Sequence, residues 1–238
     1  MKCRFIIIFS LLTCLLNAQI TEKKVSWDYP VKPGSIEWVN FTTGRQMVEA
    51  CQIPQEVLDT INTRNLAEIC INYPLFLDYS ALNDERKGIS NMIERFNGLK
   101  ELNKRKNGVE ELINIYKNFP ILTEVPQKSS KDYYAPLKLP FIELLLSDDS
   151  FIKQLNNQMS VELEKIILDK YIGKLENPHI YSVYNIKKTF LLGAVVMMHN
   201  KKFENALEQH DIVKRYIENY FHSDSALLTE ISKIITAR

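Results

Sequence analysis

The chain has 238 residues, with 30 basic and 29 acidic side chains and 45% hydrophobic residues. This near-neutral balance excludes the strongly basic surface that binds nucleic acid or an anionic membrane. Because there are only 7 glycines, and leucine, isoleucine, lysine and glutamate are abundant, the composition disfavours a turn-rich β-sandwich. It predicts an all-α protein with a sizeable core.

Residues 1–18 have the features of a secretory signal peptide. Lys2 and Arg4 precede an apolar run over residues 5–16, and the small residue Ala18 closes it. The run is too short for a membrane span of about 20 residues. We therefore expect cleavage after Ala18.

The mature chain would begin at Gln19 and be exported to the periplasm or the cell exterior. An alternative is a lipid anchor on Cys14, although Thr13 stands where a lipoprotein signal needs a small residue. Since the leader removes Lys2 and Arg4 from the 30 basic residues, the mature chain would carry 28 basic against 29 acidic residues. We expect no nucleic-acid partner and no transmembrane segment in it, and another envelope or surface protein is the partner class left open.

Two cysteines, Cys51 and Cys70, would remain after export. In an oxidising compartment they can form a disulfide that closes a loop of about 20 residues and contributes on the order of 3 kcal/mol. The alternative is a pair of buried thiols acting as small apolar residues, since each lies on the apolar face of its predicted helix. No CxxC motif or neighbouring histidine accompanies them, so a metal site is not predicted.

Residues 19–41 are predicted to be an extended segment, because Pro30 and Pro33 favour turns and extended backbone. Its two tryptophans, Trp27 and Trp38, are large apolar anchors. We expect them to cover the helical core, with a binding surface as the alternative.

An N-terminal helical half is predicted over residues 42–118. Its apolar spacing indicates three short helices within 46–77 and one long helix over 84–106, followed by a helix that returns antiparallel to it. Gly88 and Gly98 weaken the long helix by about 1 kcal/mol each relative to alanine. We interpret them as sites where another element packs closely.

Four motifs between Tyr29 and Arg105 carry a resemblance: YPVKPGSIEW, MVEACQIP, EVLDTINTRNLAEICINYPL and FNGLKELNKR. They resemble a group of uncharacterised exported bacterial proteins that share the Tyr-Pro-x-Lys-Pro-Gly and Cys-Gln-Ile-Pro patterns. The resemblance implies export and an all-helical fold, and it brings no activity, substrate or site residue.

Residues 119–140 are predicted to be a Pro-rich loop, followed by a C-terminal helical half over 141–238. Loops of this length in a compact domain are either functional or disordered, and both readings stay open. The loop carries two tyrosines that extend the candidate interaction surface, which comprises Trp27, Trp38, Tyr133 and Tyr134.

The C-terminal half contains an almost wholly apolar helix, FLLGAVVMMH over residues 190–199, which other helices should enclose. Further helices are predicted over 203–220 and 227–235. Successive helix pairs joined by short turns predict stacked antiparallel hairpins, an irregular array similar to an α-solenoid within one compact domain.

No motif predicts a catalytic, cofactor-binding or metal-binding residue. The sequence has no GxSxG, SxxK, GxGxxG, Walker or HExxH pattern, and its four histidines do not share a chelating spacing. The first functional hypothesis is therefore a non-catalytic exported protein with a binding or scaffolding role. The alternative is a secreted hydrolase or lyase, or a small-molecule binder, with a cleft between the two helical halves near the 119–140 loop.

Overall fold

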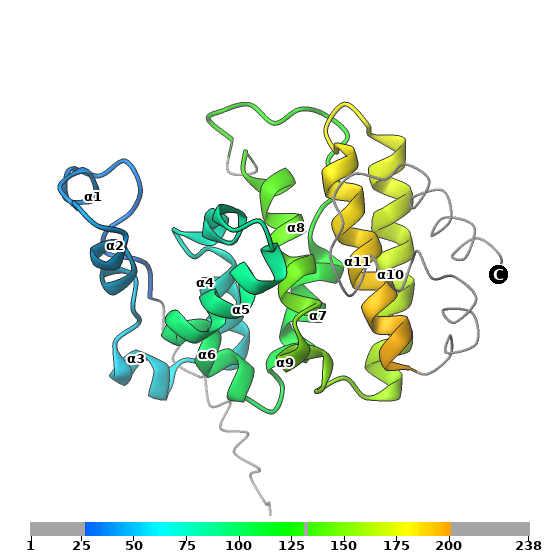
Figure 1. Cartoon of the computed structure of the whole chain (residues 1–238), viewed down its shortest axis with the longest axis horizontal. Coiled ribbons are helices and arrows are strands. Elements are labelled where there is room, and N and C mark those ends of the chain that lie inside the picture. Colours follow the sequence, from blue (N-terminus) through cyan, green and yellow to red (C-terminus); the bar gives the residue numbers. More distant parts are fainter. Residues whose placement is uncertain (1–26, 131–132, 201–238) are drawn as a thin grey trace, which may run out of the picture.

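The computed structural model describes residues 27–130 and 133–200. Throughout these ranges the regular elements are helices (Figure 1), which confirms the all-α prediction. They are α1 (Ile36–Val39), α2 (Gly44–Ala50), α3 (Gln55–Thr60), α4 (Thr63–Ile71), the 3-10 helix η1 (Phe76–Ala81), α5 (Glu85–Arg95), α6 (Asn97–Lys104), α7 (Gly108–Asn118), α8 (Ala135–Leu146), α9 (Asp149–Ile152), α10 (Asn157–Glu176) and α11 (Val183–His199).

The predicted signal peptide and the helices predicted over 203–220 and 227–235 lie outside the described residues. Of the helices that are described, none has the length and apolar character needed to cross a membrane.

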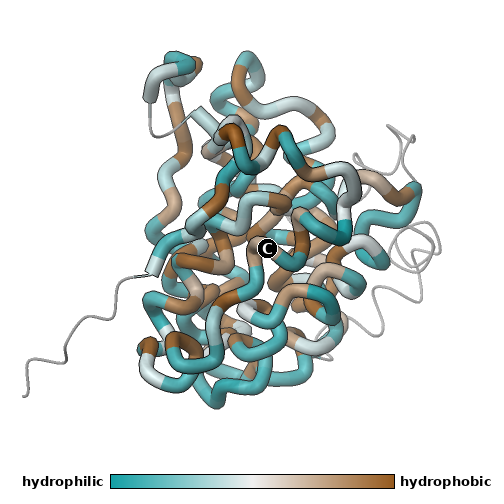
Figure 2. The backbone as a smooth tube through the Cα atoms, turned by 90° about the vertical axis from the view of Figure 1, so that its left-hand side faces the viewer, coloured by the Kyte–Doolittle hydropathy of each residue, from teal (hydrophilic) through white to brown (hydrophobic). Residues whose placement is uncertain are grey.

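Helix α8 lies in the middle of the described body, between α5 and η1 on one side and α11 on the other (Figure 1), and it also packs on α7. Its residues 139–146 are all buried. A helix that is apolar on nearly every side needs neighbours on every side, and the elements that contact α8 include α4, α5, α7, α9, α11 and η1. In Figure 2 the hydrophobic parts of the backbone gather along the interior, while most outer turns are hydrophilic.

Helices α10 and α11 form the longest packed pair, at one end of the molecule (Figure 1). The prediction of a deeply buried helix here holds for residues 187–196, which are all buried. The last turn differs, because Met198 is 39% exposed.

The predicted loop over 119–140 is too long, because α8 begins at Ala135 and contains both Pro136 and Pro140. Pro136 lies in the first turn, where no N–H is needed. Pro140 cannot donate to the carbonyl of Pro136, and this carbonyl instead accepts a hydrogen bond from the Asn185 side chain on α11 at 2.8 Å. A distant residue thus satisfies the group that the proline leaves unpaired.

The predicted long helix over 84–106 is two helices, α5 and α6, separated by the extended residue Phe96. The side chain of Asn97 accepts a hydrogen bond from the Ile53 N–H at 2.9 Å and donates one to the Ile53 carbonyl at 2.7 Å. These two bonds fix Asn97 against the chain before α3. Local periodicity alone does not reveal this break.

Close packing at the two glycines is confirmed. A Cβ on Gly88 would lie 2.3 Å from the carbonyl oxygen of Tyr79 in η1, so α5 contacts η1 through its backbone. A Cβ on Gly98 would lie 2.5 Å from the ring of Phe96. Gly88 needs the absence of a side chain because it meets backbone, whereas a side chain at Gly98 would displace the ends of the Phe96 and Ile53 side chains.

The three short helices predicted within 46–77 are α2, α3 and α4. Thr43 caps α2 in a capping box with Gln46. Asn62 caps helix α4, because its side chain accepts a hydrogen bond from the Asn65 N–H at 2.8 Å, and Thr63 is already helical.

Cys51 follows α2 and Cys70 lies in α4, and both are fully buried free thiols in the structure. Burial raises the pKa of Cys51 to about 12 and that of Cys70 further. This arrangement is the one expected of thiols that act as small apolar residues. A disulfide in the exported protein stays a prediction, and the loss of two hydrogens in the intact mass would reveal it.

Candidate functional site

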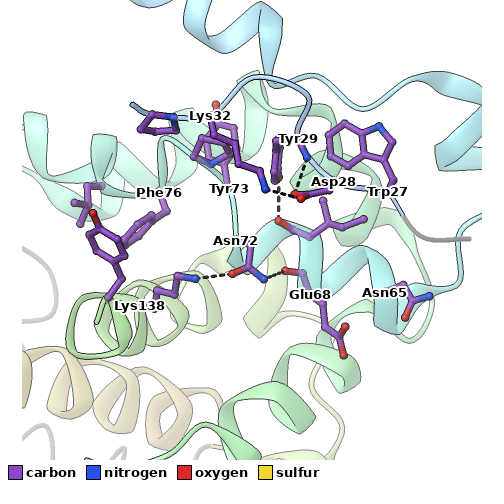
Figure 3. Close-up of a pocket in the computed structure, with 15 residues that line it drawn as sticks. Trp27, Asp28, Tyr29, Lys32, Asn65, Glu68, Asn72, Tyr73, Phe76 and Lys138 are labelled. Carbon is purple, nitrogen blue, oxygen red and sulfur yellow. Dashed lines mark hydrogen bonds and ion pairs between the residues drawn. The ribbon is translucent and has the colours of Figure 1, made fainter. Parts of the chain in front are cut away.

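A cavity of about 690 Å³ opens where the N-terminal segment, residues 27–33, crosses α4 and η1 (Figure 3). The start of α8 forms its remaining wall through Tyr134 and Lys138. Its volume exceeds the approximately 460 Å³ of another hollow, which is lined by residues within 121–130.

Tyr29 fixes the N-terminal segment over this cavity. Its side chain is buried, and its hydroxyl donates a hydrogen bond to the carbonyl oxygen of Ile69 in α4 at 2.9 Å. Its ring contacts Trp27 edge to face, with centroids 4.7 Å apart, and lies 6.2 Å from the ring of Tyr73. Burial raises the pKa of Tyr29 well above its ordinary value, so the hydroxyl stays a donor. The segment therefore covers the helical body, as its aromatic residues predict.

The polar floor of the cavity forms where α4 ends. Tyr73 precedes Pro74, which disfavours helical backbone, so the helix stops at Ile71 and Asn72 becomes its C-cap. The Asn72 side chain donates to the carbonyl oxygen of Glu68 at 2.8 Å and accepts from Lys138 Nζ at 2.5 Å. Figure 3 shows both bonds as a continuous line from α8 to α4.

Lys138 reaches this floor from the first turns of α8. Partial burial removes water from its ammonium group and lowers its pKa. Among the described residues no carboxylate lies within 4 Å of it, and Asn72 is its hydrogen-bond partner.

The other charged residues of the cavity have charged partners. Lys32 forms an ion pair with Asp28 on the N-terminal segment. Glu68 lies at the rim and pairs with Arg64 one turn earlier on α4, at 3.6 Å.

Aromatic rings line two sides of the cavity. Trp27 and Tyr73 lie on the side of the N-terminal segment, and Tyr73 stacks on Phe96 in the core with centroids 4.2 Å apart. Phe76 of η1 and Tyr134 lie on the other side, in edge-to-face contact at 6.4 Å. The site therefore combines apolar walls with one amide and one ammonium group on the floor.

The structure brings together part of the predicted interaction surface. Trp27 and Tyr134 both line the cavity. Tyr133 contacts Tyr134, with centroids 5.1 Å apart, but does not line it. Trp38 lies on α1, packs on Phe41 at 5.8 Å and takes no part in the cavity.

Sequence reasoning missed Asn72 and Lys138. The signal for Lys138 was a lysine in the largely apolar run APLKLPFIELLL, where a charged side chain needs access to solvent or a partner, and where Glu143 is the other charged residue. Asn72 had the weaker signal of an amide just before the helix-ending Tyr-Pro pair.

The 119–140 loop has a hollow of its own of about 460 Å³, lined by residues within 121–130, and the cleft expected between the two helical halves stays a prediction. Its acidic residue is Glu124, and nearby His179 contacts the carbonyl oxygen of Thr123 through Nε2 at 3.2 Å. The larger cavity takes only Tyr134 and Lys138 from this part of the chain.

A second polar cluster lies inside the helical body. Lys174 of α10 and Glu143 of α8 are both fully buried, and Lys174 Nζ lies 2.8 Å from each carboxylate oxygen. Lys174 also donates to Thr189 at 2.8 Å, and the Tyr116 hydroxyl donates to Glu143 at 2.9 Å. This cluster ties α7, α8, α10 and α11 together.

No protein-family model, curated protein or solved structure matches the chain. In the part of the chain that the structure describes, no group of three histidine, cysteine or acidic residues is placed to hold a metal ion. The cavity presents ammonium, amide, carboxylate and aromatic groups.

Proposed function

We propose that this chain is an exported, non-catalytic binding protein that holds a ligand in the cavity between the N-terminal segment, α4 and α8. The observation that carries the proposal is the cavity itself. Its volume of about 690 Å³ lies within the range of about 300–1,000 Å³ that is typical of ligand sites. Such sites combine apolar walls with a few convergent polar groups, as this one does.

The polar groups support binding better than catalysis. General acid–base or nucleophilic catalysis needs a nucleophile and a base within hydrogen-bond reach of each other. In the described cavity wall, Asp28 is engaged by Lys32, and Glu68 lies beside Arg64 at the rim. Groups held in this way orient a bound molecule more readily than they transfer a proton.

The two tryptophans of the chain provide a test, because Trp27 lines the cavity and Trp38 does not. A thermal-shift screen of sugars, peptides, organic acids and fatty acids would supply candidate ligands. For a true ligand, tryptophan emission should change in Trp38→Phe, which retains Trp27, and stay constant in the matched variant Trp27→Phe. Equal responses of the two variants, or a screen without a saturable hit, would contradict the proposal.

Export is the second part of the proposal and rests on the features of residues 1–18. N-terminal sequencing of protein recovered from the periplasm or the medium should begin at Gln19. A membrane-bound form released only by detergent and lost in Cys14→Ala would favour the lipid anchor instead. Protein that remains in the cytoplasm and retains Met1 would contradict export.

A scaffolding role with another envelope or surface protein is the second candidate, and it is favoured by α1. Ile36 and Val39 on this helix are 81% and 74% exposed, at the end of the molecule distant from α10 and α11 (Figure 1). A photo-crosslinker at Ile36 should capture one recurrent envelope protein, and one at the exposed residue Glu110 on α7 should not. Recovery of uncrosslinked monomer from both would remove this candidate.

A further inference from the structure

The charges of the cavity leave one group without a charged partner. Four charged side chains line it, two acidic and two basic. Asp28 and Lys32 neutralise each other, and Glu68 has Arg64 beside it. Among the described residues that line the cavity, the ammonium of Lys138 is the charged group that faces a neutral partner, the Oδ1 of Asn72.

Three other water-depleted lysines of the described body have stronger partners. Lys174 pairs with Glu143, and Lys188 pairs with Glu85. Lys170 donates to backbone carbonyls at the end of α7, where the helix dipole is negative. Lys138 differs from these lysines because its charge is not matched within the described protein.

The position of Lys138 is nevertheless fixed. Its Nζ donates to Asn72 at 2.5 Å, and Asn72 is itself held by the carbonyl of Glu68. Figure 3 shows the ammonium at the floor, between the wall that carries Phe76 and the α4 wall. An ammonium has three donors, and the bond to Asn72 uses one of them.

The aromatic walls indicate what the apolar part of the ligand should be. Trp27 and Tyr73 face the cavity from one side, and Phe76 and Tyr134 from the other. Rings favour flat apolar partners through stacked or edge-to-face contacts. A molecule that fills this space would place its apolar body between the walls and its polar end on the floor.

Building on the proposed function, we propose that the ligand is a small organic acid: a flat apolar body with one carboxylate that pairs with the Lys138 ammonium. The carboxylate would supply the negative charge that the cavity lacks. A charge-assisted hydrogen bond of this kind is about twice as strong as a neutral one, so the acid should bind more tightly than its uncharged analogue.

Isothermal titration with 1-naphthylacetate and 1-naphthylacetamide tests this inference, because the two compounds differ only in the charged group. The wild-type protein should bind the acid about tenfold more tightly than the amide. Lys138→Met should bind both equally, and Lys138→Arg should retain the preference. Lys100→Met removes an exposed lysine on α6 and serves as the control, which should behave as the wild type does.

Lys138→Gln covers the case in which the methionine variant does not fold, because glutamine keeps an N–H donor for Asn72 without the charge. Equal wild-type affinities for acid and amide, or a preference that survives in Lys138→Gln, would overturn the inference. Failure of both compounds, together with neutral hits that change Trp27 emission, would overturn it and leave the proposed function standing. Failure of both compounds and of the Trp27 screen would remove both.

Discussion

Lys174 and Lys138 show two ways in which this fold accommodates a lysine that has lost water. Lys174 is fully buried and has a carboxylate, a hydroxyl and a carbonyl as partners. Lys138 is partly exposed, faces a cavity and is bonded to a neutral amide. Desolvation lowers the pKa of both. The complete set of partners indicates a structural role for Lys174, and the incomplete set supports the proposal that Lys138 pairs with a ligand.

Removing Lys174 should have the largest effect on stability. Lys174→Met leaves Glu143 buried without a cation, and breaking a buried pair in this way costs about 3–5 kcal/mol. Chemical denaturation should show this loss. The double variant Lys174→Met with Glu143→Leu should recover part of it, because no uncompensated charge remains. A loss below about 1 kcal/mol in the single variant would contradict the structural role.

A smaller loss is expected when a neutral member of the same cluster is removed. Tyr116→Phe deletes the hydrogen bond to Glu143 and should cost about 2 kcal/mol, a typical value for a bond to a charged group. Tyr133→Phe is the matched control, because that tyrosine is 39% exposed, and its variant should unfold as the wild type does. Equal midpoints for the two variants would show that the cluster is not tightly coupled.

The buried thiols extend the comparison to groups that are neutral in the fold. Burial raises the pKa of Cys51 from 9.0 to about 12, so the unfolded chain loses this proton first as the pH rises. The contribution of this thiol to the free energy of unfolding is fully present below pH 9. It should fall by about 1 kcal/mol between pH 9 and pH 10. Denaturation of Cys51→Ala over this interval should show a shallower decline than the wild type. Parallel pH profiles would contradict a raised thiol pKa.

The smallest effect on stability is expected at Lys138. Lys138→Met removes one hydrogen bond and also a partly desolvated charge, so its unfolding free energy should stay within about 1 kcal/mol of the wild-type value. Thermal denaturation of Lys138→Met and Lys174→Met in parallel would compare the two losses of stability. A loss as large as that of Lys174→Met would make Lys138 a structural residue.

Local patterns predicted the helices but not the contacts that interrupt or extend them. The spacing of apolar residues predicted α2, α3 and α4. The break at Phe96 depends on a bond between Asn97 and Ile53, 44 residues away. The helix through Pro140 depends on Asn185, which donates to Pro136 across 49 residues. Neither partner is visible in a local window.

The candidate site was likewise predictable only in its local features. Trp27 and Tyr134 were recognisable as large aromatic residues in segments without regular structure. The polar floor was not, because Asn72 and Lys138 are 66 residues apart and meet only when α8 packs beside α4. An ammonium without a charged partner can be recognised only after its neighbours are known.

The most direct test of the central claim is a crystal structure of the protein with 1-naphthylacetate. The account predicts that the naphthalene ring lies between Trp27 and Phe76 and that a carboxylate oxygen lies about 2.7–2.9 Å from Lys138 Nζ. A ring bound elsewhere, or a carboxylate that faces solvent away from Lys138, would contradict it.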